Sequence, residues 1–234
     1  GQPSLNKALI KLEKKQVQQL ILVPLYPQYA SSTTGSTFES AFELISKWKQ
    51  IPNVKIIHHF HDHPGFIDAF ASHIKQYKPE NHDHIIMSYH GLPLNHVTEA
   101  HGGMNCEDLG CTEKQNDQNN YCYRASCYKT SRLLAKKLNL MKQDYTVCFQ
   151  SRLDNNWLKP FTDEIVIQKA KTGYKRLLVI SPAFVADCLE TLYELGMELK
   201  EDFEKEGGEQ LTLVKSLNDL PQWVNTMGEM IKEV

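Results

Sequence analysis

The chain has 234 residues, enough for one large domain or two small domains with a buried core. Its formal net charge of -2 predicts no general attraction to nucleic acid or to anionic membranes. No apolar run approaches the roughly 20 residues that span a bilayer, and no signal-peptide pattern opens the sequence. We therefore expect a cytoplasmic protein with no nucleic-acid partner.

Short apolar runs rich in β-branched residues alternate with longer segments of helical periodicity. This alternation predicts an α/β fold in which parallel strands are connected by right-handed helical crossovers. The predicted strands cover residues 19–25, 54–60, 84–89, 145–149, 176–180 and 211–214. The predicted helices cover residues 5–16, 36–49, 65–77, 125–138, 162–172, 187–206 and 220–232.

Two segments interrupt this alternation. Residues 78–83 are polar and contain a proline, which predicts a domain boundary. Residues 96–121 form a long connection rich in Gly, Asn, Asp and Cys, without a clear period. A connection of this length within a compact domain is usually functional or held by additional bonds.

Ligands of open parallel sheets bind beyond the carboxyl ends of the strands, and His90 stands at such a place. It follows the strand predicted at 84–89 and precedes Gly91, so we expect it to face a crevice. An imidazole can bind a metal ion or accept a proton near neutral pH. The alternative is a histidine that is merely hydrogen-bonded at a strand end, one of ten histidines in the chain.

Glu190, Glu194 and Glu198 are spaced four residues apart in a predicted helix, so their carboxylates share one face. Like charges at this spacing disfavour a helix by about 0.2–0.5 kcal/mol per pair. A row of oxygen ligands can hold cations or pass a metal ion or a proton along the helix. The alternative is the solvated acidic face of a surface helix.

Several ordered blocks of this sequence resemble the ferrochelatase family, of the bacterial type, whose members insert ferrous iron into protoporphyrin. The similarity covers nearly the whole chain. The blocks are residues 25–36 (LYPQYASSTTGS), 88–93 (SYHGLP), 149–152 (FQSR) with 157–158 (WL) and 160–164 (PFTDE), and 181–194 (SPAFVADCLETLYE).

The resemblance implies roles for individual residues. His90 and Glu190 would face each other across the porphyrin cleft as ligand of the substrate Fe2+ and as proton acceptor, and Glu194 and Glu198 would continue as a proton or metal path. The residues implied to bind porphyrin are Tyr26, Gln28, Tyr29, Ser32, Thr33 and Trp157. For Tyr29 and Trp157 the alternative is ordinary core packing.

The resemblance also implies two Rossmann-like, chelatase-type domains with parallel sheets flanked by helices. Residues 1–82 would be the remainder of an N-terminal domain, residues 83–216 a C-terminal domain with a Cys-rich loop at 96–127, and residues 217–234 a helix that packs back on the first domain. The chain matches the C-terminal two-thirds of the family pattern. We therefore expect an N-terminally truncated fragment, which could lack activity.

Cys106, Cys111, Cys122 and Cys127 give the pattern C-x4-C-x10-C-x4-C within the irregular segment. A disulfide pair suits an oxidising compartment, structural zinc suits a Cys₄ site, and an iron–sulfur cluster also takes four thiolates. Some ferrochelatases carry a [2Fe–2S] cluster, so the resemblance implies that cluster here, with zinc as the alternative.

Two other functions compete with Fe2+ insertion during haem synthesis. One is a chelatase for another tetrapyrrole or metal, and the other is a haem- or metal-binding module without turnover. Because porphyrin and haem are hydrophobic, peripheral contact with the inner membrane face is a further expectation, although no basic amphipathic helix indicates it.

Overall fold

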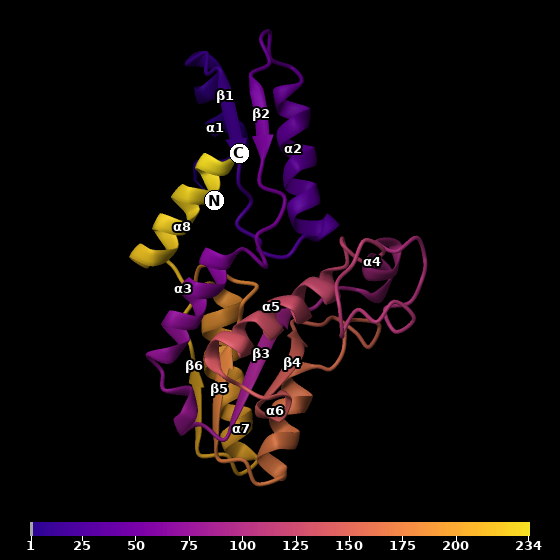
Figure 1. Ribbon diagram of the computed structural model, residues 1–234, viewed down its shortest axis with the longest axis vertical. Coiled ribbons are helices and arrows are strands. Elements are labelled where there is room, and N and C mark those ends of the chain that lie inside the picture. Colours follow the sequence, from indigo (N-terminus) through magenta and orange to yellow (C-terminus); the bar gives the residue numbers. More distant parts are fainter. Residues whose placement is uncertain (1) are drawn as a thin grey trace.

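The predicted alternation of strands and helices folds into two parallel sheets (Figure 1). The structure is a computed structural model and describes residues 2–234. The smaller sheet pairs β1 (Gln19–Leu22) with β2 (Asn53–Ile56). The larger sheet has the order β4-β3-β5-β6, built from β3 (His84–His90), β4 (Tyr145–Gln150), β5 (Arg176–Ile180) and β6 (Gln210–Leu213).

Helices cover both sheets. The α-helices are α1 (Leu5–Lys14), α2 (Ser36–Ile45), α3 (Pro64–Lys75), α4 (Leu94–Glu99), α5 (Tyr123–Leu138), α6 (Thr162–Lys171), α7 (Leu199–Lys205) and α8 (Pro221–Glu233). Two π-helical segments, η1 (Ser31–Gly35) and η4 (Glu190–Glu198), and two short 3₁₀ turns, η2 (Pro79–Asn81) and η3 (Lys142–Asp144), complete the described elements. Among residues 2–234, no helix is long and apolar enough to cross a membrane.

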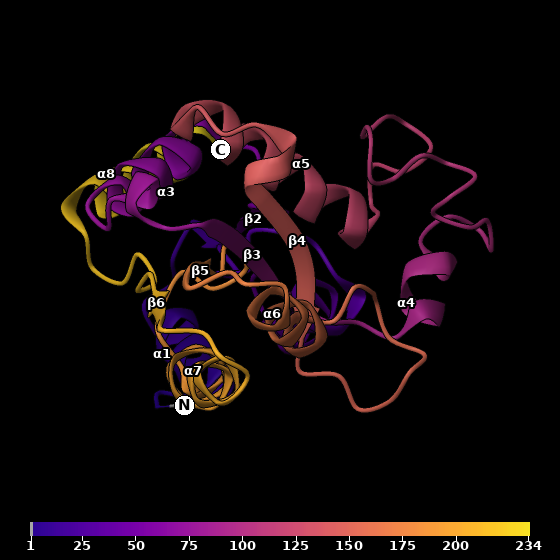
Figure 2. The same ribbon diagram turned by 90° about the horizontal axis from the view of Figure 1, so that it is seen from below.

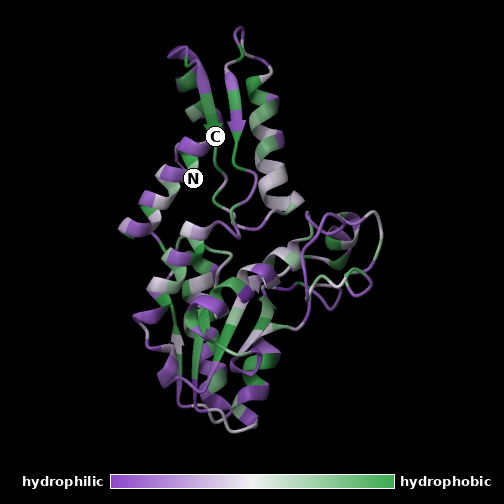
Figure 3. Ribbon diagram, in the orientation of Figure 1, coloured by the Kyte–Doolittle hydropathy of each residue, from purple (hydrophilic) through white to green (hydrophobic). Residues whose placement is uncertain are grey.

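The larger sheet lies between two layers of helices (Figure 2). Successive side chains of a strand point to opposite faces, so Ile85 and Met87 of β3 pack toward α3 and α5 while Ile86 packs toward α6 and α7. Hydrophobic residues therefore gather along these strands (Figure 3). The predicted α/β class, with parallel sheets flanked by helices, is confirmed.

The last helix, α8, contacts α3 through an aromatic cluster. The Trp223 ring centroid lies 5.5 Å from that of Phe60 and 5.8 Å from that of Phe66. Gly65 permits this approach, because a Cβ at that position would lie 2.7 Å from Thr226 Cγ2. The division into residues 1–82, 83–216 and 217–234 stays a prediction.

Several predicted elements differ from the observed ones, and the helix predicted at 36–49 ends already at Ile45. The first two strands end earlier than predicted, at Leu22 and Ile56. Pro24 follows β1 and has no N–H to continue the ladder. The helix predicted at 187–206 is π-helical from Glu190 to Glu198 before it becomes α7, and the Leu199 N–H bonds the carbonyl of Glu194, five residues back. Such wide turns are rare and often occur at functional sites.

Candidate active-site cleft

A cleft of about 770 Å³ lies at the carboxyl ends of the strands. It is bordered by the segment after β1, by the end of β3 and by the segment that leads into η4. Its lining is mainly apolar, with a few polar groups. These residues are Pro24, Leu25, Tyr26, Gln28, Ala30, Ser32, Thr33, Thr37, His90, Leu92, Tyr123, Ala183, Phe184, Val185, Ala186, Cys188 and Glu190.

His90 ends β3 and is held by its immediate neighbours. Its Nδ1 lies 2.7 Å from the Gly91 carbonyl oxygen. Because a carbonyl oxygen only accepts, Nδ1 carries the proton, and Nε2 of the neutral ring keeps its lone pair for a metal ion or a proton. Gly91 is required here, since a Cβ would lie 2.8 Å from the Gln150 carbonyl oxygen and 3.2 Å from the Trp157 ring.

Tyr123 connects the start of α5 to this histidine. Its hydroxyl donates a hydrogen bond of 2.9 Å to the His90 carbonyl, and its ring lines the cleft. The aromatic and hydroxyl parts of a buried tyrosine can serve these two purposes together. Sequence reasoning missed Tyr123, because the contact spans 33 residues and an irregular loop.

Glu190 lines the same cleft from the first position of η4. The Cys188 thiol hydrogen bond, the backbone N–H of Glu190 and the positive charge available to His90 lower the pKa of the Glu190 carboxyl. A glutamate with a lowered pKa stays charged at neutral pH and attracts cations.

A buried polar network joins the strand ends to η4. The Ser88 hydroxyl donates to Gln150 Oε1 at 3.0 Å, and Gln150 Nε2 donates to the Glu190 carbonyl at 3.1 Å. The Ser181 hydroxyl donates to the Ser88 carbonyl at 2.9 Å. The network fixes the backbone of Glu190 relative to the end of β3. Sequence reasoning included these residues in motifs but gave them no role.

The predicted porphyrin-binding residues of the loop after β1 line two different cavities. Tyr26, Gln28, Ser32 and Thr33 line the cleft, and the buried Gln28 side chain donates to Thr130 Oγ1 at 3.1 Å. Tyr29 instead stacks on His58, with ring centroids 4.3 Å apart, and lines a neighbouring cavity.

Trp157 does not line the cleft itself. Its ring lies beside that of His90, with centroids 6.4 Å apart, and its backbone forms an isolated antiparallel bridge with Pro93. This bridge and the contact with Gly91 place Trp157 against the outer side of the turn that follows β3.

Glu194 and Glu198 line a second cavity, of about 590 Å³, whose lining does not include Glu190. The Ser151 hydroxyl donates to Glu194 Oε2 at 2.5 Å. Arg152 lines this cavity as well, but it pairs with Asp163 at 2.7 Å. The row of glutamates therefore extends from the cleft to a separate cavity.

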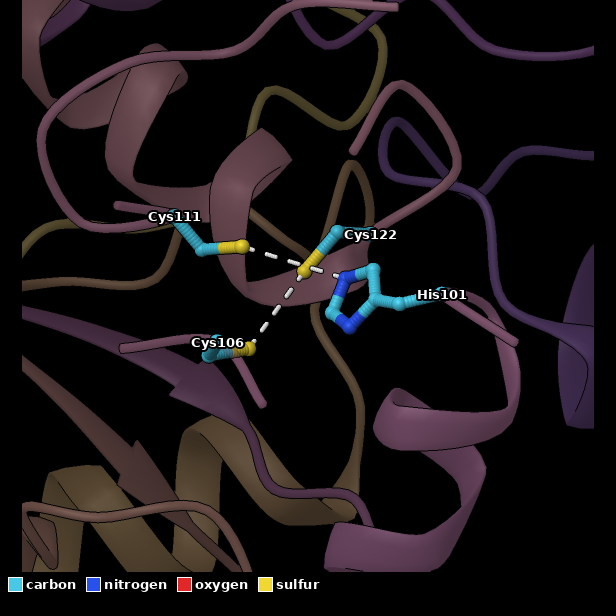
Figure 4. Close-up of side chains that lie close together, drawn as sticks. All are labelled: His101, Cys106, Cys111 and Cys122. Atoms are coloured by element: carbon cyan, nitrogen blue, oxygen red, sulfur yellow. Dashed lines mark hydrogen bonds between the residues drawn. The ribbon is translucent and has the colours of Figure 1, made fainter. Parts of the chain in front are cut away.

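Three of the four loop cysteines meet a histidine (Figure 4). The ligand atoms of His101, Cys106, Cys111 and Cys122 all lie within 4.8 Å of one another, and all four residues are buried. A buried cluster of this composition can bind a metal ion. Sequence reasoning missed His101, although it lies only five residues before Cys106 in the same irregular segment.

Cys127 lies outside this cluster. It is five residues beyond Cys122, which is the N-cap of α5, so its side chain points about 140° around the helix from that of Cys122. It is fully buried beside Tyr123, and this burial raises the pKa of the Cys127 thiol. The regular geometry of α5 separates these two cysteines, which the C-x4-C spacing had grouped.

Solved structures share this fold. SirB from Bacillus subtilis with Fe3+ matches with a TM-score of 0.64 at 12% identity, covering 100% of this chain and 78% of SirB. The sirohydrochlorin chelatase SirB from Bacillus subtilis subspecies spizizenii in complex with cobalt matches with a TM-score of 0.61 at 12% identity, covering 100% of this chain and 76% of that one. The fold is that of the chelatase class.

Sequence comparison identifies the family within that class. The ferrochelatase profile matches residues 1–234. The ferrochelatase of Legionella pneumophila (strain Corby) is 43% identical over 234 residues, which are 100% of this chain and 69% of the relative. That of Coxiella burnetii is 41% identical over 243 residues, covering 100% of this chain and 66% of the relative.

The chain belongs to the ferrochelatase family, and it spans about two thirds of the length of these relatives. The family predicted from the sequence is confirmed, and with it the class of enzyme, a lyase that inserts a metal ion into a porphyrin. Fe2+ insertion into protoporphyrin is the function that these relatives support.

Proposed function

We propose that this chain carries out the metal- and proton-handling part of Fe2+ insertion into protoporphyrin IX, with His90 and Glu190 as the reacting residues. The observation that carries the proposal is the hydrogen bond from His90 Nδ1 to the Gly91 carbonyl. It leaves Nε2 as the basic atom, in a cleft that Glu190 also lines.

Porphyrin metallation requires that two pyrrole N–H protons leave as the metal ion enters. Fe2+ accepts both imidazole nitrogen and carboxylate oxygen ligands, so either residue can hold it before transfer. A neutral imidazole with a free ring nitrogen can also accept a proton. His90 and Glu190 together therefore provide one ligand set for the substrate ion and one route for its protons.

The size and the walls of the cleft suit a flat apolar ligand. Its volume of about 770 Å³ lies within the range of ligand pockets. Leu92, Phe184 and Val185 supply apolar surface for the macrocycle, whereas Ser32 and Thr33 supply hydroxyl groups that can meet its carboxylates.

In our proposal, Tyr29 and Trp157 do not line the cleft but support the segments that form its walls. Tyr29 holds the loop after β1 through its stack on His58. Trp157 packs beside the His90 ring and limits its movement.

Glu194 and Glu198 form the proposed path between the cleft and the second cavity. Their positions four and eight residues beyond Glu190 continue the carboxylate row along η4. Cations or protons can move along such a row of oxygen ligands. In the second cavity, the Ser151 hydroxyl donates a hydrogen bond to Glu194 of this path.

Two finer predictions about partners and cofactors stay untested. The first is peripheral contact with a membrane. The second is a [2Fe–2S] cluster on Cys106, Cys111, Cys122 and Cys127, for which the donor set in the structure has three thiols and one imidazole.

The test is His90→Ala in the protein. We expect iron insertion to be abolished while porphyrin binding, measured by fluorescence quenching, is retained, because the macrocycle walls are untouched. His82→Ala, two residues before the start of β3, is the matched control and should insert iron at the normal rate. Turnover retained by His90→Ala would reject the proposal.

A further inference from the structure

The loop cluster has a donor set that differs from the one that a four-thiolate iron–sulfur cluster uses. A [2Fe–2S] cluster is usually held by four cysteines. Here the fourth donor is the imidazole of His101, and Cys127 is buried in the hydrophobic core beside Tyr123. Three thiolates and one imidazole are a common ligand set of structural zinc.

The distances fit one ion at the centre of a tetrahedron. Zinc–sulfur bonds of about 2.3 Å in tetrahedral geometry place two sulfur atoms about 3.8 Å apart. The Cys106 and Cys122 sulfur atoms are 3.7 Å apart, and Cys111 Sγ lies 3.8 Å from His101 Nε2. Two irons would spread their ligands over a larger volume than these contacts enclose.

Neighbouring groups orient three of the four donors, His101, Cys111 and Cys122, as they do in metal sites. His101 Nδ1 donates to the Met104 carbonyl at 3.2 Å, which leaves Nε2 free to bind a metal ion. Asn119 Nδ2 donates to Cys111 Sγ at 3.5 Å, and the Ala125 N–H donates to Cys122 Sγ at 3.4 Å. Hydrogen bonds to sulfur stabilise thiolates.

The cluster also explains how the irregular segment is held. Residues 102–105 are exposed, as are most residues from 112 to 121, and the segment between α4 and α5 contains no strand. It extends away from the sheet (Figure 1). Its buried residues include Cys106, Cys111 and Asn119, so ligation takes the place of a larger apolar core.

We propose that His101, Cys106, Cys111 and Cys122 bind one zinc ion in a closed tetrahedral site, and that Cys127 is not a ligand. Three thiol protons pass to solvent when Zn2+ binds, and the ion keeps its oxidation state. Because all four positions are filled by the protein, the site is structural and has no place for a substrate.

This site continues into the catalytic cleft through adjacent residues. Cys122 caps α5, and the next residue, Tyr123, donates to the His90 carbonyl. The zinc ion therefore fixes the start of α5 and, with it, the backbone of His90. This consequence for catalysis rests on the proposed function, whereas the metal site itself does not.

The decisive measurement is metal analysis of the purified protein together with X-ray absorption at the zinc edge. We expect one zinc ion per chain, no inorganic sulfide, and a first shell of three sulfur atoms at about 2.3 Å and one nitrogen atom at about 2.0–2.1 Å. Two irons with two inorganic sulfides per chain would overturn the site, and so would a shell of four sulfur atoms. These readouts do not depend on activity.

Variants give a second, independent test. Cys106→Ser and Cys111→Ser should bind less than a tenth of the wild-type zinc, whereas His101→Cys should still bind zinc because it supplies a fourth thiolate. Cys127→Ala and Cys148→Ala are the matched controls, since both remove a buried thiol, and they should keep the full zinc content. Loss of metal in Cys127→Ala, but not in Cys148→Ala, would overturn the assignment.

Discussion

The Tyr123 hydroxyl is the contact through which the helix after the cysteine loop reaches His90. In Tyr123→Phe the His90 carbonyl loses its donor, which costs about 1–3 kcal/mol for a buried acceptor. We expect kcat for iron insertion to fall about tenfold, because small misplacements of a reacting group are costly. KM for porphyrin should change little, since the ring of residue 123 still lines the cleft.

Steady-state kinetics in both substrates separate these two effects. Tyr128→Phe, on the same helix, is the matched control and should leave both constants near their original values. A rise in KM with unchanged kcat in Tyr123→Phe would show that the hydroxyl serves porphyrin binding rather than the position of His90.

His84 makes the free energy of unfolding depend on pH. Burial lowers the pKa of His84 from 6.5 to about 4, and its Nε2 lies 2.8 Å from Thr146 Oγ1. Below pH 6.5 the unfolded chain therefore binds a proton that the folded chain takes up only near pH 4. The contribution of His84 to the free energy of unfolding is complete above pH 6.5. It is lost as the pH falls toward 4, by on the order of 3 kcal/mol.

Urea unfolding at several pH values between 7 and 4 measures this loss. His84→Asn removes the titrating group, so the free energy of unfolding should vary less with pH than in the wild type. Part of the dependence should remain, because burial also lowers the pKa of His61 to about 4. Parallel pH curves for the variant and the wild type would contradict this account.

At the residue scale, the sequence allowed us to predict those site residues that a local rule places at the end of a strand. The strand-end rule predicted that His90 and Glu190 would lie near one crevice, and both line the cleft; their chemical roles remain predictions. Tyr123 and His101 were missed because long irregular connections, which carry no periodic pattern, bring them to their partners.

Among the elements, the contact between α3 and α8 depends on the missing side chain of Gly65. In Gly65→Ala the new methyl group would lie 2.7 Å from Thr226 Cγ2, and overpacking of this kind costs about 1–3 kcal/mol. Thr226→Ala shortens the opposing side chain. We therefore expect the double variant to lose less free energy of unfolding than the two single variants lose together.

A double-mutant cycle by urea denaturation measures the coupling between these positions. Residues in contact typically show interaction energies of about 0.5–3 kcal/mol. Gly228→Ala, in α8 with open space around it, is the matched control and should not couple to Thr226→Ala. Additive effects of Gly65→Ala and Thr226→Ala would show that the two helices do not pack as described.

Element prediction succeeded where hydrophobic periodicity is strong. The buried strands β3, β4 and β5 lie within a residue of their predicted positions, because continuous apolar runs mark strands covered on both faces. The π-helical turns of η4 had no such signal. A spacing of four residues keeps Glu190, Glu194 and Glu198 near one face in either kind of helix, so the row was predicted although the helix type was not.

Across the whole molecule, one hydrophobic core connects the larger sheet, α8 and the segment after β2 to the cysteine loop. The same cluster of buried residues includes Ile57 near the smaller sheet, Met87 of the larger sheet, Trp223 of α8 and Cys122 of the loop. A change at the loop therefore reaches the cleft through packed side chains. The core residues could be predicted from their hydrophobic side chains. The position of the loop on the core could not, because in our proposal it depends on the zinc ligands of the loop.

Removal of zinc should loosen the loop while the sheets stay folded. A ligand that binds only the folded state stabilises it according to its concentration and affinity, and the loop has little other buried surface. Lys114 is exposed in this loop, so we expect trypsin to cleave there at least tenfold faster after treatment with a chelator. Mass spectrometry should identify the fragments. Cleavage should abolish iron insertion, because Tyr123 is then no longer held.

Readdition of zinc before the protease should restore protection in the wild type and in Cys127→Ala, but not in Cys106→Ser. Equal cleavage rates with and without zinc would show that the loop does not depend on the ion.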